Sequence, residues 1–429
     1  MRSIGLSIKE DASVYWKILF FSGLNIAAAF VLNLILPQKI GVGVYGDYRY
    51  LYSLIGFAGL FHLGYLDGFY LLSLEKNATQ KASMGYLGLL VCAGLVLANI
   101  AAGFMGYEMG ESALLIALMI VVSNFINFIS LSFNIRHSFI APLATQLLVT
   151  LLMIICLFNN DIASWMVLHL YPTILILLVV QIGVLIIINL FAPEKGSFSI
   201  RFRSWKQIKW FHEKGIKTLA IGLVILLGLG LDKLVLKSLL PKESFGAYCF
   251  SNSFLISFLG LGLSVSNKLV SYLYQKTEQF KEQYNQIVRN ISFVSIALIG
   301  LGVWITQWEW VENLGYAKLL HDLVPSLGLF PFLLLIQLVY SNLAKVYGLE
   351  IKFTLFYLIA IGVSFFIFKL CFGNIYLMLV LTSLVYYLTM LLLDQFLVKP
   401  NCGYQLSLQN KLIAFLPIVV EVILYQFYV

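Results

Sequence analysis

The sequence predicts an all-α polytopic membrane protein with about 12 transmembrane helices. Of its 429 residues, 61% are hydrophobic and 11% are charged, whereas soluble globular domains carry about 25% charged residues. Apolar runs of about 20 residues, the length that spans a bilayer as a helix, recur along the chain. The longest polar stretch is Glu194–Lys217, which leaves no room for a large soluble domain.

The apolar runs define the expected helices in order. The first run is long enough to span, so we interpret it as a helix and not as a cleaved signal peptide. The stretch 411–429 is either a thirteenth span or an interfacial helix, because Glu421 interrupts it. The twelve expected spans are residues 14–36, 50–74, 84–106, 112–133, 138–158, 165–192, 216–240, 246–274, 286–307, 323–346, 350–371 and 375–397.

The positive charges predict the orientation. Lys and Arg concentrate in cytoplasmic loops of membrane proteins. With the N-terminus placed in the cytoplasm, most of the 28 Lys and Arg fall on that side. The net charge of +8 therefore needs no nucleic-acid partner. The outer side keeps Lys39, Arg49, Lys237, Lys242 and Lys318.

One helix junction occurs twice. The first span ends in a proline turn that leads to Tyr45-Gly46-Asp47-Tyr48, and the seventh ends in a similar turn that leads to Phe245-Gly246-Ala247-Tyr248. Six spans per copy start both copies on the same side of the membrane, which is the pattern of a parallel repeat. The basic loop Glu194–Lys217 would join the two copies on the cytoplasmic side.

These features resemble a known family. The two junctions, an amphipathic N-terminal segment and the Asp-Lys-aliphatic motif at Asp232 are similar to those of Wzx-type (O-antigen) polysaccharide repeat-unit flippases, within the multidrug/oligosaccharidyl-lipid/polysaccharide exporter superfamily. The resemblance covers nearly the whole chain. It implies two six-helix lobes, residues 1–200 and 201–429, that form a V around a central cavity.

The resemblance also implies a function. Such proteins export an undecaprenyl-diphosphate-linked oligosaccharide across the bacterial inner membrane by alternating access, and some are coupled to ions. The expected driving force is then a proton or sodium gradient, and the expected partners are the lipid-linked oligosaccharide, membrane lipids and a glycan polymerase. The alternative is a multidrug or metabolite antiporter of the same superfamily, coupled to cations. The sequence contains no metal-ligand spacing, phosphate-binding loop or catalytic triad, so we expect no enzyme and no bound cofactor.

Five residues are candidates for substrate binding, because a diphosphate needs cations and a glycan needs polar contacts. Lys233 and Lys237 lie one helical turn apart and would form a cationic ladder. Lys268 lies near the cytoplasmic end of a helix with a small polar face, where it either contacts substrate or reaches the interface. The remaining two candidates are Arg49 and Asn25.

Three further residues are candidates for ion coupling or gating. Intramembrane acids usually face a cavity or pair with a cation. Asp67 would either bind an ion or pair with Lys268 or Lys17. Asp232 would pair with Arg49 or Lys39, since neighbouring residues on a helix point about 100° apart and Lys233 is then a poor partner. His62 is either a hydrogen-bonded interior histidine or a proton carrier.

Overall fold

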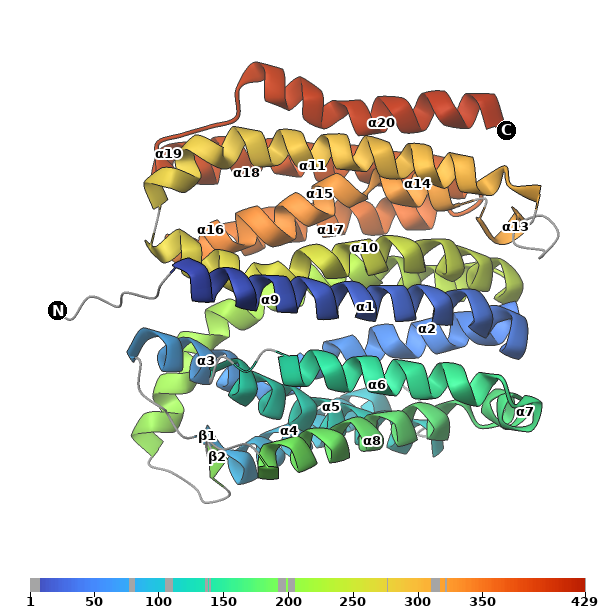
Figure 1. Ribbon diagram of the computed structural model, residues 1–429, viewed down its shortest axis with the longest axis vertical. Helices are drawn as coiled ribbons and strands as arrows, with labels where there is room; N and C mark the ends of the chain where they lie inside the picture. The colour runs from blue at the N-terminus through green and yellow to red at the C-terminus, as the bar shows by residue number, and fades with distance from the viewer. Residues whose placement is uncertain are drawn as a thin grey trace. The chain divides into compact units, whose positions relative to one another are not determined.

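The computed structural model confirms the predicted all-α membrane class. It describes residues 8–76, 82–104, 111–135, 138, 140–191, 198–199, 205–275, 277–309, 317–320 and 322–428, and nearly all of them are helical (Figure 1). Among these residues, nine helices are long and apolar enough to cross a membrane, and a bent pair of helices makes a tenth candidate. The chain divides into two compact units, Met1–Ile40 with Leu54–Leu219, and Gly41–Ser53 with Ala220–Val429.

The first unit consists mainly of long helices that pack side by side. Helix α1 packs along α6, and α5 packs along α8. A short two-stranded parallel sheet pairs Ala82 with Phe198. The elements of the first unit are α1 (Ile8–Ile40), the end of α2 (Val42–Gly56), η1 (Phe57–His62), α3 (Tyr65–Lys76), β1 (Ala82–Ser83), α4 (Met84–Phe104), α5 (Glu111–Ile135), α6 (Ile140–Leu157), α7 (Asn160–Leu168), α8 (Leu170–Phe191), β2 (Phe198–Ser199) and the start of α9 (Trp205–Leu239).

The second unit contains the end of α9, the start of α2 and all later helices. Helix α17 packs along α18, and α10 packs against α14, α15 and α16. The later elements are α10 (Lys242–Gln275), α11 (Thr277–Thr306), α13 (Ala317–Leu320), α14 (Leu323–Gly328), α15 (Phe330–Leu334), η2 (Leu335–Tyr340), α16 (Ser341–Val346), α17 (Glu350–Cys371), α18 (Ile375–Leu393), η3 (Asp394–Val398), α19 (Lys399–Cys402) and α20 (Leu408–Tyr428).

The second expected span is broken, which the sequence analysis did not predict. Helix α2 passes into the 3-10 turn η1, and the chain then bends by 70° before α3. Leu63 and Gly64 adopt left-handed backbone conformations at the bend, with φ of 46° and 77°. A non-glycine residue rarely adopts this conformation, so the surrounding packing must hold Leu63 in place.

The N-terminal part of α9 provides that packing. The seventh span was expected to begin at residue 216, but α9 begins at Trp205 and takes up much of the predicted basic loop. Ile208 and Phe211 are buried on one face of this added segment. A Cβ atom at Gly215 would overlap the backbone of Gly64, so these two segments approach as closely as glycine allows.

The tenth expected span has the predicted limits but an irregular backbone. Residues 323–346 form α14, α15, the π-helical segment η2 and α16 in succession. Pro331 lies at the start of α15, and Pro325 lies within α14. Proline lacks the amide proton that continues a helix, which accounts for the interruption between α14 and α15. The segment is also the most buried of the candidate spans, at 89%.

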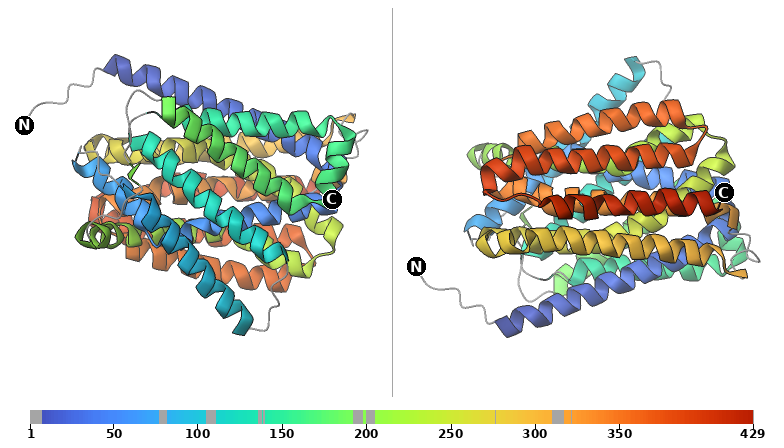
Figure 2. Two further views of the ribbon diagram at one scale, coloured as in Figure 1. Left: turned by 90° about the horizontal axis from the view of Figure 1, so that it is seen from below. Right: turned by 90° about the horizontal axis from the view of Figure 1, so that it is seen from above.

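The last apolar stretch is a continuous helix of 21 residues, α20. It packs along α11, and it also contacts α14 and α18. Figure 2 shows α20 and α11 running side by side in its right-hand view. Helix α20 is not one of the nine candidate spans among the described residues, so a thirteenth span stays a prediction.

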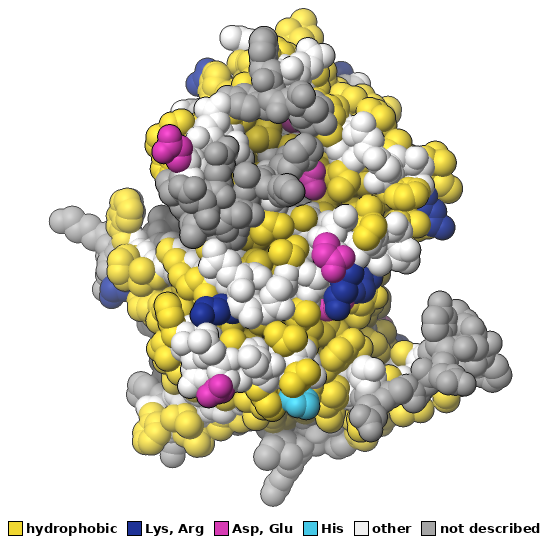
Figure 3. All heavy atoms as spheres, turned by 90° about the vertical axis from the view of Figure 1, so that its right-hand side faces the viewer, with side chains coloured by type: hydrophobic (Ala, Val, Ile, Leu, Met, Phe, Trp, Pro, Cys, Tyr) yellow, Lys and Arg dark blue, Asp and Glu magenta, His cyan; other side chains and the backbone are white. Residues whose placement is uncertain are grey.

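The distribution of side chains is that of a membrane protein. Large apolar residues are exposed along α8 and α17, including Val179, Ile187, Ile359 and Phe366. Buried polar side chains are numerous in both units. Figure 3 looks onto the ends of the helices, where hydrophobic and polar side chains are mixed with a few charged ones. A lipid-facing exterior and a partly polar interior explain this distribution.

Candidate functional site

The Asp232–Lys233 pair lies in the interior of the second unit, on α9. Lys233 Nζ lies 3.2 Å from Asp232 Oδ2 and also donates to the carbonyl of Leu229 at 3.2 Å. The expectation that these neighbours would not pair is therefore wrong. The long lysine stem bends back along the helix and brings its amine to the adjacent carboxylate. Neither Arg49 nor Lys39 is the partner of Asp232 among the described contacts.

Burial explains this local pairing. Lys233 is fully buried, and Asp232 is 8% exposed. A buried charge is strongly unfavourable unless it is paired and hydrogen-bonded. The hydroxyl of Tyr248, on α10, donates to Asp232 Oδ2 at 2.5 Å and completes the set of partners. The amine of Lys233 is occupied in this structure, so a role in binding substrate would require the pair to separate.

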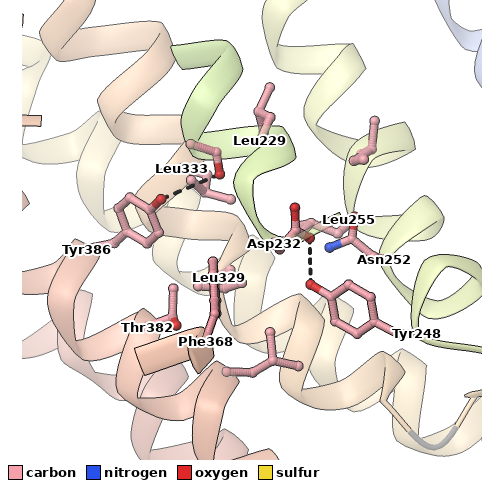
Figure 4. A pocket seen from close by; sticks show the side chains of 13 residues that line it. Leu229, Asp232, Tyr248, Asn252, Leu255, Leu329, Leu333, Phe368, Thr382 and Tyr386 are labelled. Atoms are coloured by element: carbon pink, nitrogen blue, oxygen red, sulfur yellow. Dashed lines mark hydrogen bonds between the residues drawn. The ribbon is translucent and has the colours of Figure 1, made fainter. Parts of the chain in front are cut away.

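A small pocket adjoins Asp232 (Figure 4). Helices α9, α10 and α18 contribute its polar lining, which includes Tyr248, Asn252, Thr382 and Tyr386. Leu229, Leu255 and other apolar residues close the rest. The pocket has room for about one water molecule. It is therefore far too small for a glycan and has the size and polarity of a site for water or a small ion.

Lys237 pairs with an acid that sequence reasoning missed. Its amine contacts Asp47 Oδ1, and Lys242 Nζ lies 3.2 Å from Asp47 Oδ2. Lys237 Nζ also lies 5.4 Å from the centre of the Phe245 ring, within range of a cation–π contact. Lys237 and Lys233 thus each have a carboxylate partner, and they do not form an unpaired cationic ladder in this structure.

The two copies of the repeated junction meet around this ion pair. A Cβ atom at Gly46 would lie 3.0 Å from Gly246 Cα, and one at Gly246 would overlap the carbonyl of Val42. The glycine in each aromatic-Gly-x-Tyr sequence is therefore required by the close approach of the other copy. Asp47 follows the first of these glycines. The repeat was the signal that pointed to this contact, although it was interpreted only as evidence of duplication.

Arg49 and Asn25 have different surroundings. Asn25, on α1, donates to the carbonyl of Leu143 on α6 at 2.9 Å, so it links two helices of the first unit. Arg49 lies on α2 in the second unit and is partly exposed. Its Nε is buried and has no hydrogen-bond partner among the described residues. A guanidinium with a buried nitrogen left unbonded by the described residues is suited to binding an anion, which keeps Arg49 as a candidate for the diphosphate.

His62 and Asp67 lie at the bend of the second span. His62 Nδ1 is 3.9 Å from Asp67 Oδ2, and His62 is buried. Lys17, one of the two predicted lysine partners of Asp67, is exposed on α1. Lys268 lies in α10, but its side chain is outside the residues that the structure describes.

A second histidine, His212 of α9, was missed by sequence reasoning. Its Nδ1 lies 2.8 Å from the carbonyl of Leu63, and its Nε2 lies 3.0 Å from the hydroxyl of Tyr86. It therefore joins the left-handed residue of the bend to α4. Its position in a basic stretch that we interpreted as a loop concealed this role. No group of three or more His, Cys, Asp or Glu gathers as a metal site within the described part of the chain.

Comparison with solved structures identifies the fold. No protein-family model matches the sequence, and no curated protein matches it. Among solved structures, the chain resembles the lipid II flippase MurJ in an inward closed conformation, with a TM-score of 0.55 and 14% identity over 97% of this chain and 98% of that one. The chain shares the fold of this flippase. An inward-facing multidrug resistance MATE family transporter of the MOP superfamily aligns at a TM-score of 0.45 and 12% identity, over 99% of this chain and 96% of that one.

Proposed function

We propose that this protein is a flippase for a lipid-linked oligosaccharide. Its cargo is an undecaprenyl-diphosphate-linked repeat unit, which it moves across the bacterial inner membrane by alternating access. The observation that carries the proposal is the fold, which the chain shares over nearly its whole length with a flippase of a lipid-linked substrate. The cytoplasmic placement of the N-terminus and an association with a glycan polymerase belong to the same proposal.

The distribution of charge supports an anionic cargo. Among the predicted cations whose side chains are described, Lys233 and Lys237 are held by acids, whereas Arg49 forms no ion pair with the described part of the chain. The planar guanidinium binds phosphate oxygens in pairs. We therefore assign Arg49 as the contact for the diphosphate. The Asp47–Lys237 pair beside it on α2 and α9 would be a latch that opens and closes during transport.

The proposal is tested in a strain that lacks the gene. Loss of the flippase should trap lipid-linked glycan on the inner leaflet and remove polysaccharide from the cell surface. Complementation with Arg49→Gln should restore little surface glycan, whereas Arg49→Lys should restore part of it, because lysine keeps the charge but not the fork of donors. The control is Lys39→Gln, which removes an exposed amine that bonds to Asn160.

Two results would contradict the proposal. Unchanged surface glycan in the deletion strain, together with new sensitivity to cationic dyes, would indicate a drug antiporter. Full complementation by Arg49→Gln would remove the diphosphate contact assigned to this residue.

A further inference from the structure

A series of buried polar side chains runs through the second unit from Asp232 to a second buried aspartate, Asp394. Asp394 begins the π-helical segment η3, after α18, and is fully buried. The amide of Leu406 donates to both of its carboxylate oxygens, at 3.0 and 3.2 Å. The amine of Lys411 lies 3.7 Å away and is 26% exposed, so it connects this end of the series with the surface.

Two tyrosines extend the series from Asp394 into the unit. The hydroxyl of Tyr284, on α11, lies 3.0 Å from Asp394 Oδ1 and 2.9 Å from the hydroxyl of Tyr340. Tyr284 has one hydroxyl proton, so when it donates to Asp394 it accepts from Tyr340. This direct chain of hydrogen bonds ends in η2, the π-helical part of the tenth span, one turn away from Gln337.

The middle of the series is polar but incompletely bonded. Both amide atoms of Gln337 and the hydroxyl of Tyr357 are buried and have no hydrogen-bond partner among the described residues. The Tyr357 hydroxyl nevertheless interacts with Gln337 and with Tyr386. A Cβ atom at Gly228 would overlap the Tyr357 hydroxyl, so glycine makes room for it on α9. The Tyr386 hydroxyl lies 3.5 Å from the carbonyl of Gly228 (Figure 4).

The series ends, on the side away from Asp394, at the pocket beside Asp232. Tyr386 and Asp232 both line it, and Asn252 Oδ1 there is buried without a hydrogen-bond partner among the described residues. The titratable groups that face Asp232 are Lys233 on its own helix, Tyr248 and Cys249 on α10, and Tyr386 on α18. The Asp232 side chain keeps 10% exposure. The Asp394 end therefore reaches the surface through Lys411, and the Asp232 end opens into the pocket.

Helix packing alone does not account for the unbonded atoms. Polar groups that only join membrane helices gain stability by bonding to each other. A buried polar group without a partner instead costs about 1–3 kcal/mol. Water molecules that bridge such groups remove most of this cost, and they need two to four polar partners. The pocket offers such partners in Asp232, Asn252 and Tyr386, and the unbonded atoms of Gln337 and Tyr357 offer them farther along the series.

We propose that these residues form a hydrated proton relay through the second unit, between Asp232 and Asp394. A proton that binds at Asp232 passes through water in the pocket to Tyr386 and Tyr357, and then through Tyr340 and Tyr284 to Asp394. Each hydroxyl and each water gives up one proton as it accepts another. Lys411, which is 26% exposed, releases a proton to solvent and then takes one from Asp394, so every residue returns to its starting protonation. Gln337 positions water and carries no proton itself. The inference rests on the proposed function in one respect, because it makes protons the ions that drive transport.

Proton movement through the full-length protein tests the relay directly. The protein is placed in liposomes that contain a pH-sensitive dye, and a potassium gradient with valinomycin sets a negative potential inside. The wild type should admit protons faster than protein-free liposomes. Tyr386→Phe and Gln337→Leu should reduce the rate to near that of protein-free liposomes.

Tyr387→Phe is the matched control. Tyr387 follows Tyr386 on α18, and its hydroxyl bonds to the backbone carbonyl of Lys411 and not to the amine that pairs with Asp394. This variant should keep the wild-type rate. Tyr357→Phe removes a hydroxyl in the middle of the relay and should slow proton entry as Tyr386→Phe does. The melting temperature of each variant, measured beside the proton rate, shows whether the protein is still folded.

The outcomes separate the relay from the proposed function. Proton entry no faster than in protein-free liposomes, or equal rates in the wild type, Tyr386→Phe and Gln337→Leu, would overturn the relay. Surface glycan that still depends on the gene would then leave the flippase proposal standing. Proton entry that is lost in these variants, in a protein whose deletion leaves surface glycan unchanged, would support the relay and overturn the flippase.

Discussion

The acid–base pairs of the two units differ in how the fold holds them. In the first unit, His62 and Asp67 lie 3.9 Å apart at a broken helix, and backbone contacts fix the break. In the second unit, Asp232 and Lys233 lie 3.2 Å apart on an unbroken helix. The two charges neutralise each other, and the Leu229 carbonyl accepts a hydrogen bond from Lys233. The comparison indicates that backbone shape controls the first site and charge balance controls the second.

Replacing Lys233 with Met should have the largest effect on stability. It leaves the Asp232 carboxylate buried without its cation, and breaking a buried pair in this way costs about 3–5 kcal/mol. Thermal unfolding in detergent micelles measures the loss. The double variant Asp232→Asn with Lys233→Met should recover much of the stability, because no charge remains to be compensated. A double variant as unstable as the single one would show that packing, and not charge, dominates this site.

Replacing Gly215 with Val should destabilise the first unit by about 3 kcal/mol. The new side chain would overlap the backbone of Gly64 and force α9 away from the bend. Gly222→Ala on the same helix is the control, since nothing lies within 4 Å of a Cβ atom there. That change should be neutral or stabilising, because alanine favours a helix by about 1 kcal/mol over glycine. Equal unfolding of the two variants would contradict the close packing at the bend.

Replacing Asp47 with Asn should cost about 1 kcal/mol or less in stability, since the pair with Lys237 is partly exposed. Its effect on transport should be larger than its effect on stability if the pair is a latch. Complementation of surface glycan, compared with the melting temperature of the same variant, separates the two effects. A variant with an unchanged melting temperature and full complementation would exclude the latch.

Replacing Asp67 with Asn should have the smallest effect on stability, about 0.5 kcal/mol. The pair with His62 is long, and the Asp67 side chain is 29% exposed. The shape of the residue is kept, so the bend should remain. A loss as large as that from Lys233→Met would show that the first unit also depends on charge balance.

The sequence predicted the class of fold because lipid imposes a pattern that composition reveals. Runs of apolar residues must be long enough to span, and positive charges mark the cytoplasmic side. The same pattern does not reveal a broken helix. The bend at Leu63 depends on the fit of Gly64 against Gly215, residues that are far apart in the sequence. The basic segment after Trp205 is polar overall, so the sequence did not reveal the apolar face that Ile208 and Phe211 form.

The candidate site was predicted only in part. Sequence reasoning selected Asp232 and Lys233 because charges are rare inside membranes, but it treated helix geometry as an obstacle to their pairing. The flexible lysine stem removed that obstacle. Asp47 and Asp394 were passed over because each lies near the end of a predicted span, where an acid needs no explanation. Only the structure shows that Asp394 is fully buried and bonded to Tyr284.

The most direct test of the account is transfer of cargo between the two leaflets of liposomes that contain the purified protein. The lipid-linked oligosaccharide carries a fluorescent label on its glycan, and a quencher that cannot cross the bilayer reports its leaflet. We expect a proton gradient to accelerate transfer by the wild type and by Tyr387→Phe, and to have no effect on Tyr386→Phe. Transfer by the wild type no faster than in protein-free liposomes, with the gradient present, would contradict the account.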